Sequence, residues 1–136
     1  MNKDRVKKFG EVYTAEKDVN EMLDLVNNEA IRIDSRFLEP ACGDGNFLIQ
    51  ILKRKLKIIE KKYKTSQVEY ERYSIQAISS LYGVDILRDN VENCRNRLSV
   101  FLFKNYENIF KENIKKKFVQ TINFILSINI VWGDAL

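Results

Sequence analysis

A short segment, Glu39–Phe47, contains the residues of this sequence that are best suited to bind a ligand. Two of the chain's five glycines, Gly43 and Gly45, lie there beside the carboxylates Glu39 and Asp44. Glycine lets a ligand approach the backbone closely, and a helix that begins directly after the turn favours a negative group at its N-terminus. The flanking carboxylates disfavour a pyrophosphate and favour a cation such as an ammonium or sulfonium group. A glycine turn alone would be an ordinary turn; the acidic residues point to a ligand.

Two further acidic residues follow glycines at the ends of predicted strands, Asp85 behind Gly83 and Asp134 behind Gly133. An acidic residue at the end of the second strand is the usual partner of ribose hydroxyls in dinucleotide sites. Asp85 lies 40 residues beyond Gly45, whereas the usual spacing is about 20, so we expect an insertion at residues 60–80. Each carboxylate alone is explained equally well as a turn or cap residue. Together they suit a ligand with an amino group, a ribose and an adenine.

Short apolar segments that run into Gly- or Pro-containing turns predict three strands: Arg36–Glu39, Leu81–Asp85 and Asn129–Trp132. Apolar residues at three- and four-residue spacing predict helices between them. The stripes are Val19, Met22, Leu23 and Val26; Leu48, Ile51, Leu52, Leu56, Ile59 and Tyr63; Val91, Cys94, Leu98 and Phe101; and Phe110, Ile114, Phe118, Ile122 and Ile125. Thr14 is the predicted N-cap of the first helix, and residues 69–81 are predicted to form a further short helix. Strands that alternate with helices predict an α/β fold with a parallel sheet covered on both faces.

The composition narrows the class of protein. A chain of 136 residues suits one domain, 1–136. It has no His and two Cys, which removes the commonest metal ligand and general base and makes a metal site unexpected. No apolar run approaches membrane-spanning length and no signal peptide is visible, so we expect a cytoplasmic protein with no membrane partner. The net charge of +4 is compatible with nucleic acid.

The glycine turn and three other segments resemble sequence motifs of one enzyme family. Phe37–Phe47 resembles motif I of adenine-N6 DNA methyltransferases, and Phe9–Thr14 is similar to their motif X. Tyr82–Asp85 resembles motif II and Trp132–Leu136 resembles motif III. The order of the motifs is that of the gamma type, which is found in restriction-modification systems. The resemblance implies a Rossmann-like S-adenosylmethionine-dependent methyltransferase fold, here the N-terminal half of the sheet.

The resemblance implies a role for each matched residue at the methionine end of S-adenosylmethionine. Tyr13 and Thr14 would contact this end, with the Thr14 hydroxyl near the carboxylate. Glu39 and the backbone of the turn would hold the methionine amino group. The turn residues concerned are Pro40, Ala41, Cys42 and Gly43.

At the nucleoside end, the resemblance implies that Asp85 accepts hydrogen bonds from both ribose hydroxyls and that Ile86 packs on the adenine. Asp134 would accept the adenine amino group, with Ala135 beside the ring.

Two departures from the family pattern matter. Ala15 stands where motif X has proline, which is mild because alanine is also a good helix former. The catalytic Asn/Asp/Ser-Pro-Pro-Tyr/Phe tetrad, which grips the flipped-out adenine, is missing, since Pro40 is the chain's one proline. We therefore expect no catalytic residue in this chain and no methylation by it alone. DNA would be bound through a complete enzyme, and the chain would self-associate or pair with a missing methyltransferase half.

Three alternatives remain open. One is a non-catalytic relative that binds the cofactor or a partner subunit. Another is a methyltransferase that acts on RNA, protein or a small molecule. The position of motif X before motif I argues against this alternative. A nicotinamide-dependent oxidoreductase ranks last, because Glu39 and Asp44 would repel a pyrophosphate.

Overall fold

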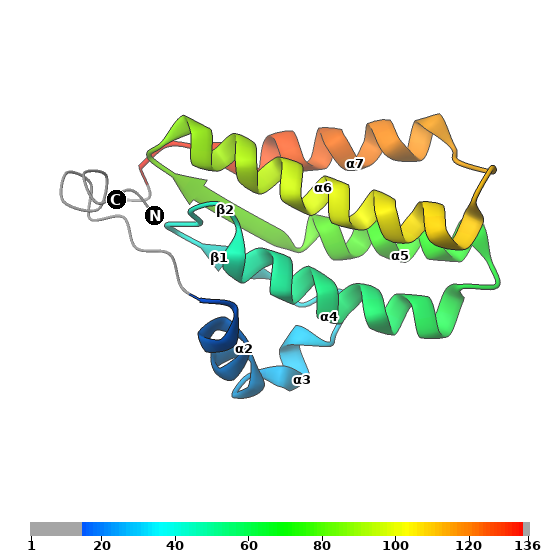
Figure 1. Cartoon of the computed structure of the whole chain (residues 1–136), viewed down its shortest axis with the longest axis horizontal. Coiled ribbons are helices and arrows are strands. Elements are labelled where there is room, and N and C mark those ends of the chain that lie inside the picture. The colour runs from blue at the N-terminus through cyan, green and yellow to red at the C-terminus, as the bar shows by residue number, and fades with distance from the viewer. Residues whose placement is uncertain (1–14, 135–136) are drawn as a thin grey trace.

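The computed structural model describes residues 15–134 and contains one parallel sheet beside six helices (Figure 1). The strands are β1 (Phe37–Glu39), β2 (Leu81–Asp85) and β3 (Ile130–Trp132), in the order β1-β2-β3. The helices are α2 (Glu16–Asp24), α3 (Asn27–Ala30), α4 (Asn46–Tyr63), α5 (Gln67–Ser79), α6 (Arg88–Phe110) and α7 (Lys116–Asn129). The α/β class and the parallel pairing are confirmed. The strand prediction is correct for β2, whereas β1 and β3 each begin one residue later than predicted.

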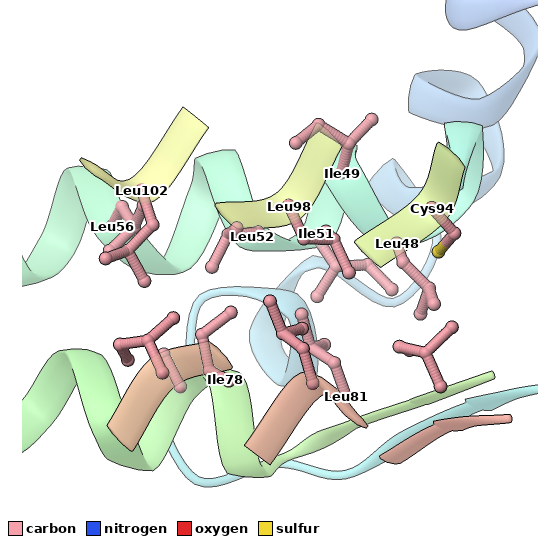
Figure 2. Close-up of a cluster of buried hydrophobic side chains, with 14 of the residues drawn as sticks. Leu48, Ile49, Ile51, Leu52, Leu56, Ile78, Leu81, Cys94, Leu98 and Leu102 are labelled. Atoms are coloured by element: carbon pink, nitrogen blue, oxygen red, sulfur yellow. The ribbon is translucent and has the colours of Figure 1, made fainter. Parts of the chain in front are cut away.

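The predicted stripes explain how the helices pack. On α4, Leu48, Ile51 and Leu52 are fully buried; they lie beside Leu98 and Leu102 of α6 on the same side of the core (Figure 2). In Figure 2, α4 and α6 form one layer, and α5, α7 and the strands lie opposite them. Because α5 ends at Ser79 and α7 ends at Asn129, each runs directly into the following strand and continues its layer.

This arrangement corrects the expectation that helices cover both faces of the sheet. Among residues 15–134, α4 and α6 pack on the face that carries Leu81, Gly83 and Asp85. The opposite face, which we call the open face, consists of Leu38, Tyr82, Val84 and Val131, placed together by the strand register. Leu38 is 65% exposed and the other three are half-buried. The second helix of each crossover extends the strand layer, so no described helix is left to cover this face.

The fourth predicted stripe is wrong as a single helix. Phe110 is the last residue of α6, Ile114 lies in the loop 111–115, and α7 begins only at Lys116. The chain turns at Lys111, which has a φ of 49°. The apolar spacing continues across the break because Phe110 and Phe118 belong to one aromatic cluster with Tyr70 and Tyr106.

Two residues of the first stripe were also predicted wrongly. Met22 and Val26 are 53% and 45% exposed, whereas Val19 and Leu23 are buried. The helix α2 ends at Asp24, before Val26, and Ala15 occupies its N-cap position. Thr14, the predicted N-cap, lies outside the described residues.

Residues 60–80, the predicted insertion, comprise the end of α4, a short turn and α5, which is shifted by two residues from the predicted helix 69–81. Tyr70, Ala77 and Ile78 are fully buried, so this segment is part of the core. Among residues 15–134, no helix combines the length and the apolar character needed to cross a membrane.

Candidate functional site

The glycine turn connects β1 to α4 at the carboxyl edge of the sheet. Gly43 and Gly45 have positive φ angles of 56° and 93°, a region that glycine enters without steric cost. The Gly45 N–H donates to Cys42 O at 3.0 Å, and its carbonyl accepts the Ile49 N–H at 2.8 Å, which starts α4. A Cβ on Gly45 would lie 2.9 Å from Cys94 Sγ of α6. The backbone of Gly45 is therefore closely approached by the helix α6, rather than by a ligand.

The turn is fastened to β2 by hydrogen bonds at the point where the strand ends. The Cys42 N–H donates to Val84 O at 2.9 Å, and the Gly43 N–H donates to Asp85 Oδ2 at 2.9 Å. Because the strands are parallel, Glu39 lies beside Gly83. The predicted segments of β1 and β2 thus meet at one edge, as ligand sites of open α/β sheets do.

Asp85 is 8% exposed and is the centre of a hydrogen-bond cluster. Besides Gly43, its carboxylate accepts the Leu87 N–H at 2.9 Å and Asn90 Nδ2 at 3.2 Å, both on Oδ1. The Asp85 carbonyl accepts the Gly133 N–H at 2.9 Å, which fastens the end of β3 to β2. Asp85 therefore joins the glycine turn, the start of α6 and, through its backbone, β3.

Glu39 ends β1 and folds back on its own turn, since its Oε1 accepts the Ala41 N–H at 3.2 Å. Glu39 is half-buried as a residue, and its carboxylate retains acceptor capacity for a cationic group. Asp44, by contrast, forms an ion pair with Arg97 of α6, with 3.3 Å between Asp44 Oδ1 and Arg97 NH1 and without hydrogen-bond geometry at that oxygen. Arg97 also donates to Asn46 Oδ1 at 2.7 Å, so it holds the turn from the far side.

Sequence reasoning missed Arg97 and Asn90, although a signal was present. Asn90, Cys94 and Arg97 recur at four and three residues, which places them on one face of α6. That face meets the glycine turn through the contacts of Arg97 with Asn46 and of Cys94 with Gly45. The apolar stripe predicts this helix, with Asp89 or Asn90 near its start, but it does not assign Asn90 or Arg97 to the site.

The two cysteines are buried against the turn. A hydrogen bond with Cys42 and burial both raise the pKa of the Cys94 thiol well above its usual range. A neutral buried thiol packs as a small apolar group and is a poor nucleophile. Cys94 is therefore a packing residue in the described structure.

The outer end of the sheet presents an aromatic side chain. Trp132 ends β3, is 58% exposed and donates its Nε1–H to Ile86 O at 2.9 Å. The Arg88 guanidinium lies 4.3 Å from the centre of the indole ring. Ile86, predicted to pack on an adenine, is 51% exposed beside these residues. An apolar surface is thus available next to Asp85.

Residues 13–136 match the family model described as the MmeI DNA-methyltransferase domain. The chain belongs to this family. A Methanocaldococcus jannaschii protein named as a type II restriction enzyme and methyltransferase is 35% identical over 104 residues. That alignment covers 74% of this chain and 8% of the relative, so the chain spans only a small part of the relative's length. No solved structure matches the chain.

In this MmeI-family domain, the structure brings together part of the predicted site. Glu39, the turn Pro40–Gly43, Asp85 and Ile86 lie at the carboxyl edge of the sheet. Asp134 is exposed directly after Gly133, at the end of the neighbouring strand. Tyr13, Thr14 and Ala135 lie outside the described residues. Within residues 15–134, no group of three or more Cys, Asp or Glu side chains is arranged to hold a metal ion.

Proposed function

We propose that this MmeI-family domain forms the S-adenosylmethionine-binding part of an adenine-N6 DNA methyltransferase of a restriction-modification system. One observation carries the proposal: in a chain of a DNA-methyltransferase family, the carboxylates of Glu39 and Asp85 flank a glycine turn at the carboxyl edge of a parallel sheet. The relative named as a restriction enzyme and methyltransferase supports the assignment to a restriction-modification system.

The chemistry of the residues at this edge of the sheet fits this cofactor. Glu39 and the backbone of the turn would hold an ammonium group, and Asp85 has an oxygen that accepts a single hydrogen bond from the described residues. Ile86 offers an apolar surface for adenine, next to Asp134 for its amino group. Tyr13, Thr14 and Ala135 keep the roles that the resemblance implies. When bound, S-adenosylmethionine supplies a methyl group activated by its sulfonium.

The distinction from a nicotinamide cofactor now depends mainly on Glu39. Asp44 is paired with Arg97, so its charge is largely compensated and repels a pyrophosphate less than the sequence suggests. Glu39 has no ion-pair partner among the described residues and still disfavours an anion at the turn. Parallel titrations with NAD test this point.

Cofactor binding can be measured directly with Trp132, the chain's one tryptophan, which lies beside Ile86. We expect S-adenosylmethionine and S-adenosylhomocysteine to change the Trp132 fluorescence and to give heat in calorimetry, and we expect NAD to do neither. Tight NAD binding without a response to the methyl donor would overturn the proposal.

Asp85→Ala tests the ribose contact. A hydrogen bond to a charged group contributes about 1.5–3 kcal/mol, so the affinity for S-adenosylhomocysteine should fall by at least about tenfold. The variant also removes the acceptor of three described donors, so its unfolding temperature should fall as well. Asp34→Ala, which changes an exposed aspartate before β1, is the matched control and should keep wild-type affinity. Unchanged affinity in Asp85→Ala would make Asp85 a turn residue only.

We expect this chain to bind the cofactor without methylating DNA. Its 136 residues contain one proline, so the Pro-Pro-Tyr/Phe tetrad that holds the flipped-out adenine is not among them. Purified chain incubated with radiolabelled methyl donor and mixed-sequence DNA should incorporate no label. Label in adenine that survives repurification and disappears in Asp85→Ala would show that catalytic residues lie elsewhere in this sequence.

A second candidate is a cofactor-binding relative without catalysis. The reading frame that follows codon 136 separates the two. A Pro-Pro-Tyr or Pro-Pro-Phe there supports the enzyme.

A further inference from the structure

The Asp85 carboxylate is more fully engaged than a bidentate ribose contact allows. Its Oδ1 accepts two hydrogen bonds from described residues, from the Leu87 N–H and from Asn90 Nδ2, and its Oδ2 accepts one, from the Gly43 N–H. A carboxylate oxygen offers about two acceptor positions. Oδ1 is therefore filled, and about one position remains, on Oδ2.

Asn90 is the one side chain among these three donors. It lies in the first turn of α6 and is 1% exposed. Burial of an amide is costly unless its polar atoms are bonded, and the Asn90 amide spends a donor on Asp85. The other two donors are backbone groups, which fix the carboxylate from the turn before α4 and from the residue before α6.

The three donors also fix the rotation of the carboxylate. Rotation about the Cβ–Cγ bond would move both oxygens, and it would break bonds to the glycine turn and to α6 together. Charge-assisted bonds of this kind are about twice as strong as neutral ones. The orientation seen in the structure is thus held from both sides.

We propose that Asn90 is a positioning residue that keeps Oδ1 of Asp85 filled, so that the carboxylate offers only Oδ2, to one ribose hydroxyl of the cofactor. This inference rests on the proposed function and replaces the expectation that Asp85 holds both hydroxyls. Asn90 acts through Asp85 and makes the ribose contact asymmetric.

Calorimetry with S-adenosylhomocysteine and its 2′-deoxy and 3′-deoxy analogues tests the asymmetry in the wild-type chain. Loss of the bonded hydroxyl should weaken binding by about tenfold or more, whereas loss of the other should weaken it by less than about threefold. Equal losses for the two analogues would overturn the inference. Failure of S-adenosylhomocysteine itself to bind would overturn the proposed function, and the inference with it.

Variants of Asn90 test whether that residue causes the asymmetry. In Asn90→Ala, Oδ1 regains an acceptor position and the carboxylate is freer to turn, so the ratio of the two analogue affinities should fall toward one. Asn90→Leu removes the same donor but fills the space, which guards against loss of folding. Asn93→Ala, at an exposed position of the same helix, should keep the wild-type ratio. A merely structural role would weaken both analogues alike, so an unchanged ratio in either folded Asn90 variant would refute the assignment.

Discussion

At the scale of the residue, Gly45 has two separate reasons to be glycine. Its φ of 93° is one that other residues adopt only with strain, and a Cβ there would press against Cys94 Sγ at 2.9 Å. Since Cys94 belongs to the core layer of α6, that sulfur has no room to retreat without moving the helix. The residue therefore sets how closely α4 and α6 approach each other at the turn.

Gly45→Ala should destabilise the chain by about 1–3 kcal/mol, because both the backbone strain and the contact with Cys94 act against it. The midpoint of thermal unfolding, followed by circular dichroism, should fall by several degrees. Gly133→Ala is the matched control, because a Cβ there would lie 4.0 Å from Val84 Cγ1, an ordinary van der Waals contact. Equal midpoints for the two variants would contradict this account of Gly45.

Particular residues show what the sequence could predict of the site. The carboxylates and glycines of the turn and of β2 were found because their chemistry is unusual at strand ends. The partners that hold them, Asn90 and Arg97, were missed because their contacts join segments more than 40 residues apart in the chain or lie within a helix start. Hydrogen-bond partners of this kind depend on how helices pack, which apolar spacing does not specify.

At the scale of the element, Lys55 connects α4 to two other parts of the fold. Its side chain is fully buried, and its Nζ donates to Ile33 O at 3.1 Å, Ser35 O at 2.5 Å and Ser80 Oγ at 2.9 Å. These acceptors lie just before β1 and β2. A single ammonium group thus fixes the starts of both strands against the helix that covers them.

Burial lowers the pKa of Lys55 from 10.5 to about 8, against the smaller opposing effects of Asp34 and Glu29 and with a further lowering effect of Arg32. Between these two pKa values the unfolded chain binds a proton that the folded chain does not. The free energy of unfolding contributed by this group should therefore rise as the pH is raised from about 8 to about 10.5.

Urea unfolding at several pH values measures this effect. Lys55→Met lacks the titrating group, so the difference in unfolding free energy between wild type and variant should shift in favour of the wild type across that window, by up to about 3 kcal/mol. A difference that stays constant with pH would show that Lys55 keeps its ordinary pKa.

The elements also show where apolar spacing misleads. The stripes of α4 and α6 were predicted correctly because each lies on one continuous helix. The stripe from Phe110 to Ile125 crosses a loop. The sequence does not predict this break, because it has neither Gly nor Pro there. Asn113 in that loop is held by Gln67, with Asn113 Nδ2 and Gln67 Oε1 2.6 Å apart, and such a tertiary contact leaves no mark on local periodicity.

At the scale of the whole molecule, the open face is the feature with the largest consequence for solution behaviour. Leu38, Tyr82, Val84 and Val131 form a contiguous apolar surface on a sheet whose outer strands, β1 and β3, have unpaired edges in the described structure. Uncovered apolar faces and strand edges favour association. The helix α7 also carries two exposed apolar side chains, Phe124 (64% exposed) and Ile128 (57% exposed).

We expect concentration-dependent self-association in sedimentation velocity. Leu38→Lys places a charge on the open face and should shift the chain toward the monomer. Val100→Lys, at a 54% exposed position on α6 in the other layer, is the control and should associate like the wild type. A compact wild-type monomer at high concentration would contradict the role given to the open face.

The strand order β1-β2-β3 has a consequence for the growing chain during synthesis. Within residues 15–134, each strand pairs only with the strand that precedes or follows it in sequence, so β1 is already made when β2 leaves the ribosome, and β2 when β3 does. Such near-neighbour pairing lowers the cost of closing loops. The sheet can therefore grow in one direction, one crossover at a time, and β3 is the last described edge to form. The pairing of β1 with β2 and the packing of α4 and α5 beside them involve no residue beyond Asp85. We therefore expect this unit to form first during synthesis from the N-terminal side.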